Sequence, residues 1–345
     1  MVKKVLFLTT LLAILASGCK PGASAPVTET ASAVPANTPI PTDTPFPPTP
    51  TPTPTETPLP PTPTPTPTET PVPPTPTPEL PRESGLEANP QRVEFQAQDG
   101  TQLVGYYYPS RFADAHIIVL AHWAGGNQRD WVEIAMWLQN RRDEVTEYPQ
   151  PTDDTSLGPW LDPSWFPPMP ADVSFAVFTF DFRGFGESAS GAWEDMLQDA
   201  QAAFETAAEM EGIDPQRMAG IGASIGADGA PGGCLLYNQT QGGGCLGAMA
   251  LSPGNYLVDF ASVVEQLEAL DPQAEVWCLA DKEDEAAYTT CKPISGDLYQ
   301  FYVFQNAGHG MMLIRPKVEP QPLVLIQQFL GELFGIPSLK GSKTR

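Results

Sequence analysis

Histidine is scarce in this 345-residue chain, which contains three: His116, His122 and His309. A zinc site is therefore not expected, because the four cysteines beyond Cys19 also match no common zinc spacing. The same scarcity leaves few candidates for a histidine general base. No metal or organic cofactor is expected.

Basic residues are also few, because 18 Lys and Arg stand against 41 Asp and Glu, for a net charge of −23. Residues 1–85 hold four of the basic and six of the acidic residues, so 14 basic and 35 acidic residues lie beyond them. Such a surface repels nucleic acid and anionic lipid, and neither is expected to bind. A neutral or cationic substrate suits this charge better than a polyanion.

Long apolar runs are lacking, and the run at residues 5–16 is too short for a stable membrane span. Two lysines precede it, and Leu15-Ala16-Ser17-Gly18-Cys19 follows, which resembles the lipobox of bacterial lipoproteins. Residues 1–19 are therefore expected to be a lipoprotein signal peptide, with Cys19 lipid-modified. An ordinary cleaved signal with a chance cysteine is the alternative. The protein is expected outside the cytoplasm, held to the bacterial membrane by the lipid anchor alone.

Residues 20–87 contain little that can be buried, since proline and threonine dominate them. Proline fixes φ and removes a hydrogen-bond donor, so we expect an extended, polyproline-II-like tether without a fold of its own. Residues 88–337 are long enough for one large domain, and residues 338–345 are expected to be a disordered tail.

The four cysteines beyond Cys19 are an even number in an exported domain, which indicates disulfides. We favour Cys234–Cys245 and Cys278–Cys291, because the members of each pair are close in sequence. Buried free thiols are the alternative.

The domain alternates between strand-like and helix-like apolar patterns, which predicts an α/β fold with a mostly parallel sheet and antiparallel N-terminal strands. The stretch 141–172 breaks this alternation, and its ends are expected on the side away from the active-site edge. We expect it to serve as structural padding or a partner surface and not as a lid. Strands are expected at 93–97, 103–108, 116–121, 175–180, 218–221, 247–251, 276–280 and 299–304, and helices near 131–138, 193–207 and 323–334.

Gly222-Ala223-Ser224-Ile225-Gly226 spells G-x-S-x-G between an apolar run and a segment of small residues. A strand that turns sharply into a helix exposes the central serine, and the flanking glycines are needed because a Cβ would collide with the backbone. A serine presented in this way attacks a carbonyl when a base takes its proton. Pro231 and nearby glycines predict that the following helix is short or kinked.

His309 is the candidate base, because it lies on a glycine-flanked loop directly after the strand 299–304. His116 starts a buried strand and is expected to be structural. The acid that orients the base should follow the strand 276–280, which gives the order serine, acid, histidine. Asp284 has the reach for this role, Asp281 is the runner-up, and Glu283 is third.

Two backbone amides must stabilise the oxyanion that forms during such a reaction. One should belong to Ile225, at the start of the helix after the serine. The other should come from the loop after strand 116–121, from Ala124 or Trp123.

Together these motifs resemble the α/β-hydrolase superfamily over residues 93–334. Residues 121–126 are similar to its H-G-x-x-G oxyanion loop, although Trp123 replaces the usual glycine, and residues 181–188 closely match its D-x-R-G-x-G-x-S turn. The resemblance is to the lidless branch with dienelactone-hydrolase-like and serine-aminopeptidase or monoglyceride-lipase-like proteins. It implies a serine hydrolase without a large cap, and most directly a carboxylesterase for small acyl esters.

Two alternatives stay open at this stage. A serine peptidase or amidase of the same fold would use the same three residues. A non-catalytic surface binding module on a retired hydrolase fold would suit the anchor and tether, with Trp160, Trp165 and Phe166 as its contact patch.

Overall fold

A computed structural model of the chain describes residues 81–150 and 158–340. The expected signal peptide, Cys19 and the tether up to residue 80 lie outside the described residues. Eight strands form a single sheet. They are β1 Gln91–Gln96, β2 Gln102–Tyr108, β3 Ala115–Ala121, β4 Ala176–Phe180, β5 Ile213–Ala223, β6 Cys245–Leu251, β7 Glu275–Asp281 and β8 Tyr299–Phe304.

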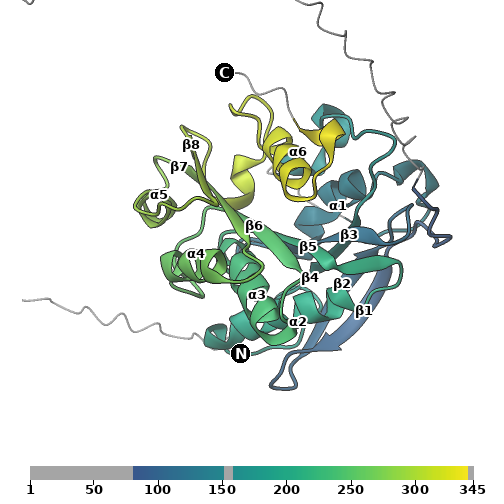
Figure 1. Cartoon of the computed structure of the whole chain (residues 1–345), viewed down its shortest axis with the longest axis horizontal. Coiled ribbons are helices and arrows are strands. Elements are labelled where there is room, and N and C mark those ends of the chain that lie inside the picture. The colour runs from purple at the N-terminus through teal and green to yellow at the C-terminus, as the bar shows by residue number, and fades with distance from the viewer. Residues whose placement is uncertain (1–80, 151–157, 341–345) are drawn as a thin grey trace, which may run out of the picture. The chain divides into compact units, whose positions relative to one another are not determined.

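The strand order is β1-β2-β4-β3-β5-β6-β7-β8 (Figure 1). β2 is antiparallel to both β1 and β4, whereas β4, β3 and β5 to β8 run parallel. This is the α/β-hydrolase fold, and it confirms the fold expected from the sequence. β3 and β6 flank β5, so the loops that follow these three strands meet at one edge of the sheet.

Helices cover both faces of the sheet, and each layer has its own buried apolar core. α1 and α6 pack on one face, and α2, α3 and α4 pack on the other (Figure 1). α4 is the one α-helix between β6 and β7, so the described chain has no large cap. The helices are α1 Val132–Gln139, α2 Met196–Ala208, α3 Ile225–Gln241, α4 Phe260–Ala269, α5 Glu285–Cys291 and α6 Pro322–Leu333.

Helix α3 corrects one expectation, because it continues through Pro231 for 17 residues and is not short. Its glycines let it approach its neighbours closely. A Cβ on Gly233 would lie 2.8 Å from the Phe204 ring, and one on Gly229 would lie 2.9 Å from the Phe182 ring. Burial of the whole first half of α3 thus outweighs the poor helix propensity of these residues.

The stretch 141–172 holds short 3₁₀ turns and reaches the edge of the sheet where β3 ends. Trp160 is buried at 3% exposure and packs edge to face on Trp123, with 5.7 Å between ring centroids. The two ends of the stretch were expected away from the active-site edge of the sheet. Trp160, which lies between those ends, instead reaches the edge where β3 ends.

The chain meets the folded body before residue 88, since Ser84 N–H donates to the Arg111 carbonyl at 2.7 Å. Arg82 also pairs with Asp114. At the other end, Leu339 is buried.

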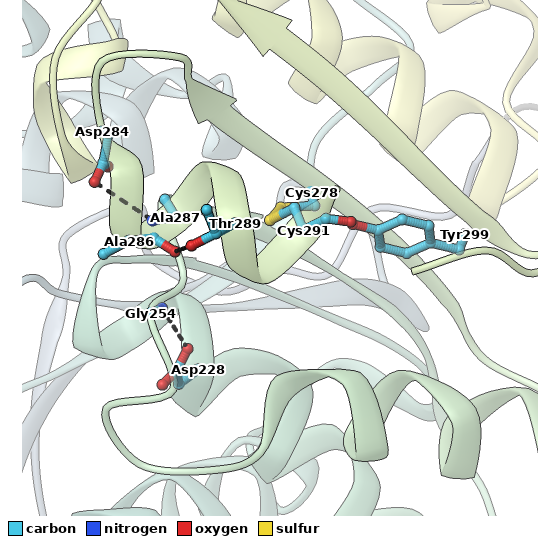
Figure 2. The surroundings of a disulfide bond; sticks show 9 residues. All are labelled: Asp228, Gly254, Cys278, Asp284, Ala286, Ala287, Thr289, Cys291 and Tyr299. Atoms are coloured by element: carbon cyan, nitrogen blue, oxygen red, sulfur yellow. Dashed lines mark hydrogen bonds between the residues drawn. A yellow bond between two sulfur atoms is a disulfide. The ribbon is translucent and has the colours of Figure 1, made fainter. Parts of the chain in front are cut away.

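Two disulfides link helices to strands of the sheet. Cys234 in α3 is joined to Cys245 in β6, and Cys278 in β7 is joined to Cys291 at the end of α5 (Figure 2). These are the two pairs that proximity in the sequence favoured.

Candidate active site

Ser224 stands at the turn between β5 and α3 with φ +53°, a left-handed value that a serine rarely adopts. A Cβ on Gly222 would strike the carbonyl of Gly226, and one on Gly226 would strike the carbonyl of Ala121. Both glycines are therefore required by close backbone approach. The Ser224 amide donates to the Leu251 carbonyl at 2.8 Å, which ties the turn to β6.

The structure brings Ser224, His309 and Asp284 together. His309 Nε2 lies 2.8 Å from Ser224 Oγ, and His309 Nδ1 lies 2.7 Å from Asp284 Oδ2. With Nδ1 donating to the carboxylate, Nε2 is left to accept from the serine hydroxyl. Burial opposes ionisation of Asp284, but the hydrogen bond from His309, the charge of that ring and the other hydrogen bonds to the carboxylate together outweigh burial and lower the pKa of Asp284. The carboxylate is thus ionised where it faces the imidazole.

Asp281 does not contact His309 but holds the loop that carries it. Its carboxylate accepts from the amides of Ala307 and Gly308, the latter at 2.7 Å, and from the Glu283 amide at 3.0 Å. Burial alone would raise the pKa of Asp281, but these donors lower it. The runner-up acid is therefore a positioning residue, and Glu283 accepts from the Asn306 amide at 2.8 Å in the same loop.

Asp284 is also the N-cap of α5, where its carboxylate accepts from the Ala287 amide at 3.4 Å (Figure 2). The disulfide between Cys278 and Cys291 fastens the far end of this short helix to β7. The position of the carboxylate thus depends on how firmly α5 is held.

His122 is a structural residue beneath the loop after β3. It is fully buried, its Nε2 accepts from the Phe182 amide at 3.0 Å, and its Nδ1 donates to the Trp123 carbonyl at 2.8 Å. Burial lowers the pKa of His122, which keeps the ring neutral. The ring therefore fixes the loop and takes no proton from the site.

The expected oxyanion donors come from two segments, the start of α3 and the loop after β3. Ile225 opens α3, so its amide belongs to the first turn, where amides have no partner within the helix. The Trp123 carbonyl is engaged by His122 and by the Gly126 amide at 3.3 Å, and Ala124 is exposed.

The motif around residue 181 anchors the same loop. Asp181 is buried and accepts from the backbone and side-chain amides of Gln128, both at 2.9 Å, and from the Glu187 amide. Arg183 is buried against Asp199 at 2.6 Å. The turn at residues 181–188 thus stabilises the loop after β3, and its side chains take no part in the triad.

Sequence reasoning missed Tyr256 and the carboxylate that places it. Asp228, one helical turn after Ser224, accepts from the amides of Gly254 at 3.2 Å, of Tyr256 and of Leu257 at 3.0 Å. Burial raises the pKa of Asp228 to about 6, against the effect of these bonds. The Tyr256 ring meets the His309 ring edge to face at 6.3 Å. The spacing of Asp228 from Ser224 was a usable signal, whereas Tyr256 had none.

Among the described residues, no group of three or more His, Cys, Asp and Glu side chains is arranged to hold a metal ion. Within residues 81–150 and 158–340, no helix is long and apolar enough to cross a membrane.

No protein-family model matches the chain. The uncharacterized protein YfhR of Escherichia coli is 29% identical over 141 residues, which cover 39% of this chain and 38% of that protein. YfhR of Salmonella typhimurium is 22% identical over 188 residues, covering 52% and 53%. The chain thus spans about two fifths to one half of the length of these curated relatives.

Solved structures with a similar arrangement include an esterase of Pyrococcus furiosus, with a TM-score of 0.45 and 16% identity over 71% of this chain and 91% of that one. A dienelactone hydrolase of Anabaena variabilis gives a TM-score of 0.43 and 13% identity over 71% and 97%. None of these similarities names a substrate for this chain.

Proposed function

We propose that this protein is a serine hydrolase, and specifically a carboxylesterase for small acyl esters. The observation that carries the proposal is the line from Ser224 Oγ through His309 to Asp284, with separations of 2.8 and 2.7 Å. A serine on a strained strand–helix turn with this partner geometry is arranged for nucleophilic attack.

In the proposed reaction Ser224 Oγ attacks the ester carbonyl while His309 Nε2 takes its proton. The ionised Asp284 stabilises the imidazolium, and the amide of Ile225, with that of Ala124 or Trp123, stabilises the oxyanion. His309 returns the proton to the departing alcohol, which leaves an acyl-enzyme. Water, activated by His309 in the same way, then releases the acid.

Charge favours neutral or cationic substrates over polyanions. The open cleft beside His309 is lined by three acidic side chains, those of Asp281, Glu283 and Asp284, and by Arg315. Arg315 donates to the carbonyls of Met312 and Ala307, which hold its guanidinium in the loop, and the three carboxylates outnumber this one cation. An anionic ester group would meet repulsion at this edge.

The proposal is tested with nitrophenyl esters and the matching anilides, using the wild-type protein and Ser224→Ala. We expect ester hydrolysis by the wild type and a loss of at least about 1,000-fold in Ser224→Ala, because removal of a triad member costs several orders of magnitude. Faster turnover of anilides than of esters would point to an amidase. Equal activity in a folded Ser224→Ala protein would contradict the serine mechanism.

A binding module without catalysis gains no support from the aromatic residues of the stretch 141–172. Trp160 is buried, and Trp165 and Phe166 are partly buried and pack edge to face with 5.0 Å between ring centroids. The Trp165 indole N–H donates to the Pro159 carbonyl at 2.8 Å. None of the three side chains is exposed, because each packs on another aromatic ring, so they do not form an exposed contact patch.

We further propose that the enzyme works outside the cytoplasm on a lipid anchor at Cys19. A fully extended Pro-rich chain of about sixty residues would reach well over 100 Å at about 3 Å per residue, so the proposed tether is long enough to hold the domain far from the membrane. Cys19→Ala should release the protein or leave an uncleaved precursor, as seen by membrane fractionation and intact mass. Normal acylation and membrane recovery of Cys19→Ala would contradict the lipobox.

A further inference from the structure

Two aromatic side chains near the Ser224–His309 pair come from the loops after the strands on either side of β5, and Tyr256 meets the His309 ring. Trp123 follows β3 and Tyr256 follows β6. The place that a Cβ on Gly310 would occupy lies 3.3 Å from Trp123 Cε3 and 3.5 Å from Ser224 Cβ. The six-membered ring of Trp123 therefore stands beside the serine, and a side chain at Gly310 would be wedged between them.

The Trp123 indole is held in one orientation. Its Nε1–H donates to Asp130 Oδ2 at 2.6 Å, and Trp160 packs on it edge to face at an interplanar angle of 87°. The indole also lies close to the backbone at Gly125, where a Cβ would be 3.1 Å away. Contacts of this kind on several sides fix the side chain as a rigid wall.

The reaction geometry decides which part of a substrate meets this wall. His309 must give its proton to the leaving alcohol, so the alcohol lies on the side of His309 and Tyr256. The oxyanion meets the amides of Ile225 and of the loop after β3, so the acyl chain takes the remaining direction beside Ser224. The Trp123 ring borders this space, because it stands beside both Ser224 and Gly310.

We propose that Trp123 determines acyl-chain specificity by closing the acyl side of the site, so that acetyl-sized groups fit and longer chains do not. The inference rests on the proposed function and adds the residue that sets the acyl size. Trp160 is a positioning residue, which links the stretch 141–172 to the site through its contact with Trp123.

The test compares kcat/KM for nitrophenyl acetate, butyrate and octanoate in the wild type and in Trp123→Ala. Each methylene that a pocket newly accepts changes discrimination by about tenfold or more, so the octanoate-to-acetate ratio should rise by at least about tenfold. Trp193→Ala is the matched control, because this indole is 41% exposed, and it should leave the ratio unchanged.

Two further variants keep the test decisive if Trp123→Ala does not fold. Trp123→Phe, which has a smaller ring, and Trp160→Ala, which frees the indole, should each raise the ratio through a lower KM for octanoate. Trp160→Phe, which keeps an aromatic edge, should restore the wild-type ratio. An unchanged ratio in the folded variants that still hydrolyse acetate would overturn the inference. Failure of the proposed function looks different, since the wild type would then hydrolyse none of the three esters or would lose nothing in Ser224→Ala.

Discussion

Asp281 and Asp284 lie three residues apart after β7, yet they meet different partners. Asp284 accepts from the imidazole of His309, whereas Asp281 accepts from amides of the loop that carries this histidine. The first contact acts on the reacting groups and the second acts on backbone geometry. Their amide substitutions should therefore differ in what they change.

Asp284→Asn should lower kcat by about 10⁴-fold, because an amide at this position no longer stabilises the imidazolium and favours the wrong tautomer. Asp281→Asn should cost less activity and more stability, because buried backbone amides lose part of their acceptor. Steady-state kinetics and urea denaturation of both variants measure the two effects. The opposite ranking of kcat would make Asp281 the acid.

His116 offers a prediction about pH. Its ring packs on Phe334 with 4.4 Å between centroids, and burial lowers the pKa of His116 to about 4. An unfolded histidine titrates near about 6.5, so between these values the unfolded chain binds a proton that the folded chain does not. This residue's contribution to stability is therefore complete above about pH 6.5 and is lost as pH falls toward about 4.

His116→Phe retains an aromatic ring and removes this titration. The free energy of unfolding should then fall less between pH 7 and pH 4, by up to about 3 kcal/mol. Urea titrations at several pH values follow the difference between the two proteins. A difference that does not vary with pH would refute the burial argument, whatever its sign.

Among the elements, α5 has the most direct connection to chemistry, since it begins at Asp284 and ends at a disulfide to β7. The second disulfide joins α3 to β6 over a similar sequence separation, 11 residues against 13. Loops of this size give each bridge a comparable entropic effect of about 3 kcal/mol. Only one of the two bridges fixes the acid.

Replacing both members of each pair by alanine separates the two roles. The Cys278→Ala, Cys291→Ala protein should lose stability and also kcat, because a looser α5 moves Asp284 away from His309. The Cys234→Ala, Cys245→Ala protein should lose a similar amount of stability while it keeps its kcat. Thermal denaturation and steady-state kinetics of both proteins test this, and equal loss of kcat would show that α5 has no special part.

The strands and helices differ in how well the sequence predicts them. Apolar runs located all eight strands, and the glycine spacing around Ser224 located the turn, because burial and close backbone approach leave local signals. The length of α3 was missed, since packing against α2 overrides the propensity of Pro231 and its glycines. The contact between Trp123 and Trp160 joins residues 37 positions apart, and no local pattern records it.

For the whole molecule, the excess of acidic residues should raise kcat/KM for cationic substrates relative to anionic ones. A quaternary ammonium ester should react with a higher kcat/KM than a carboxylate-bearing ester of the same acyl group. Screening should shrink that ratio by roughly tenfold between about 10 mM and about 500 mM salt, because the Debye length falls from about 30 Å to a few ångströms. A ratio that salt does not change would leave the surface charge without a role in specificity.

Covalent labelling shows whether Ser224 is a nucleophile that His309 activates. A fluorophosphonate reacts with such serines, so peptide mass spectrometry of the treated protein should find one phosphonyl group, on Ser224. His309→Ala should label far more slowly, because the hydroxyl then lacks its base. An active wild-type protein that carries the group on another residue, or carries none, would show that Ser224 is not the nucleophile.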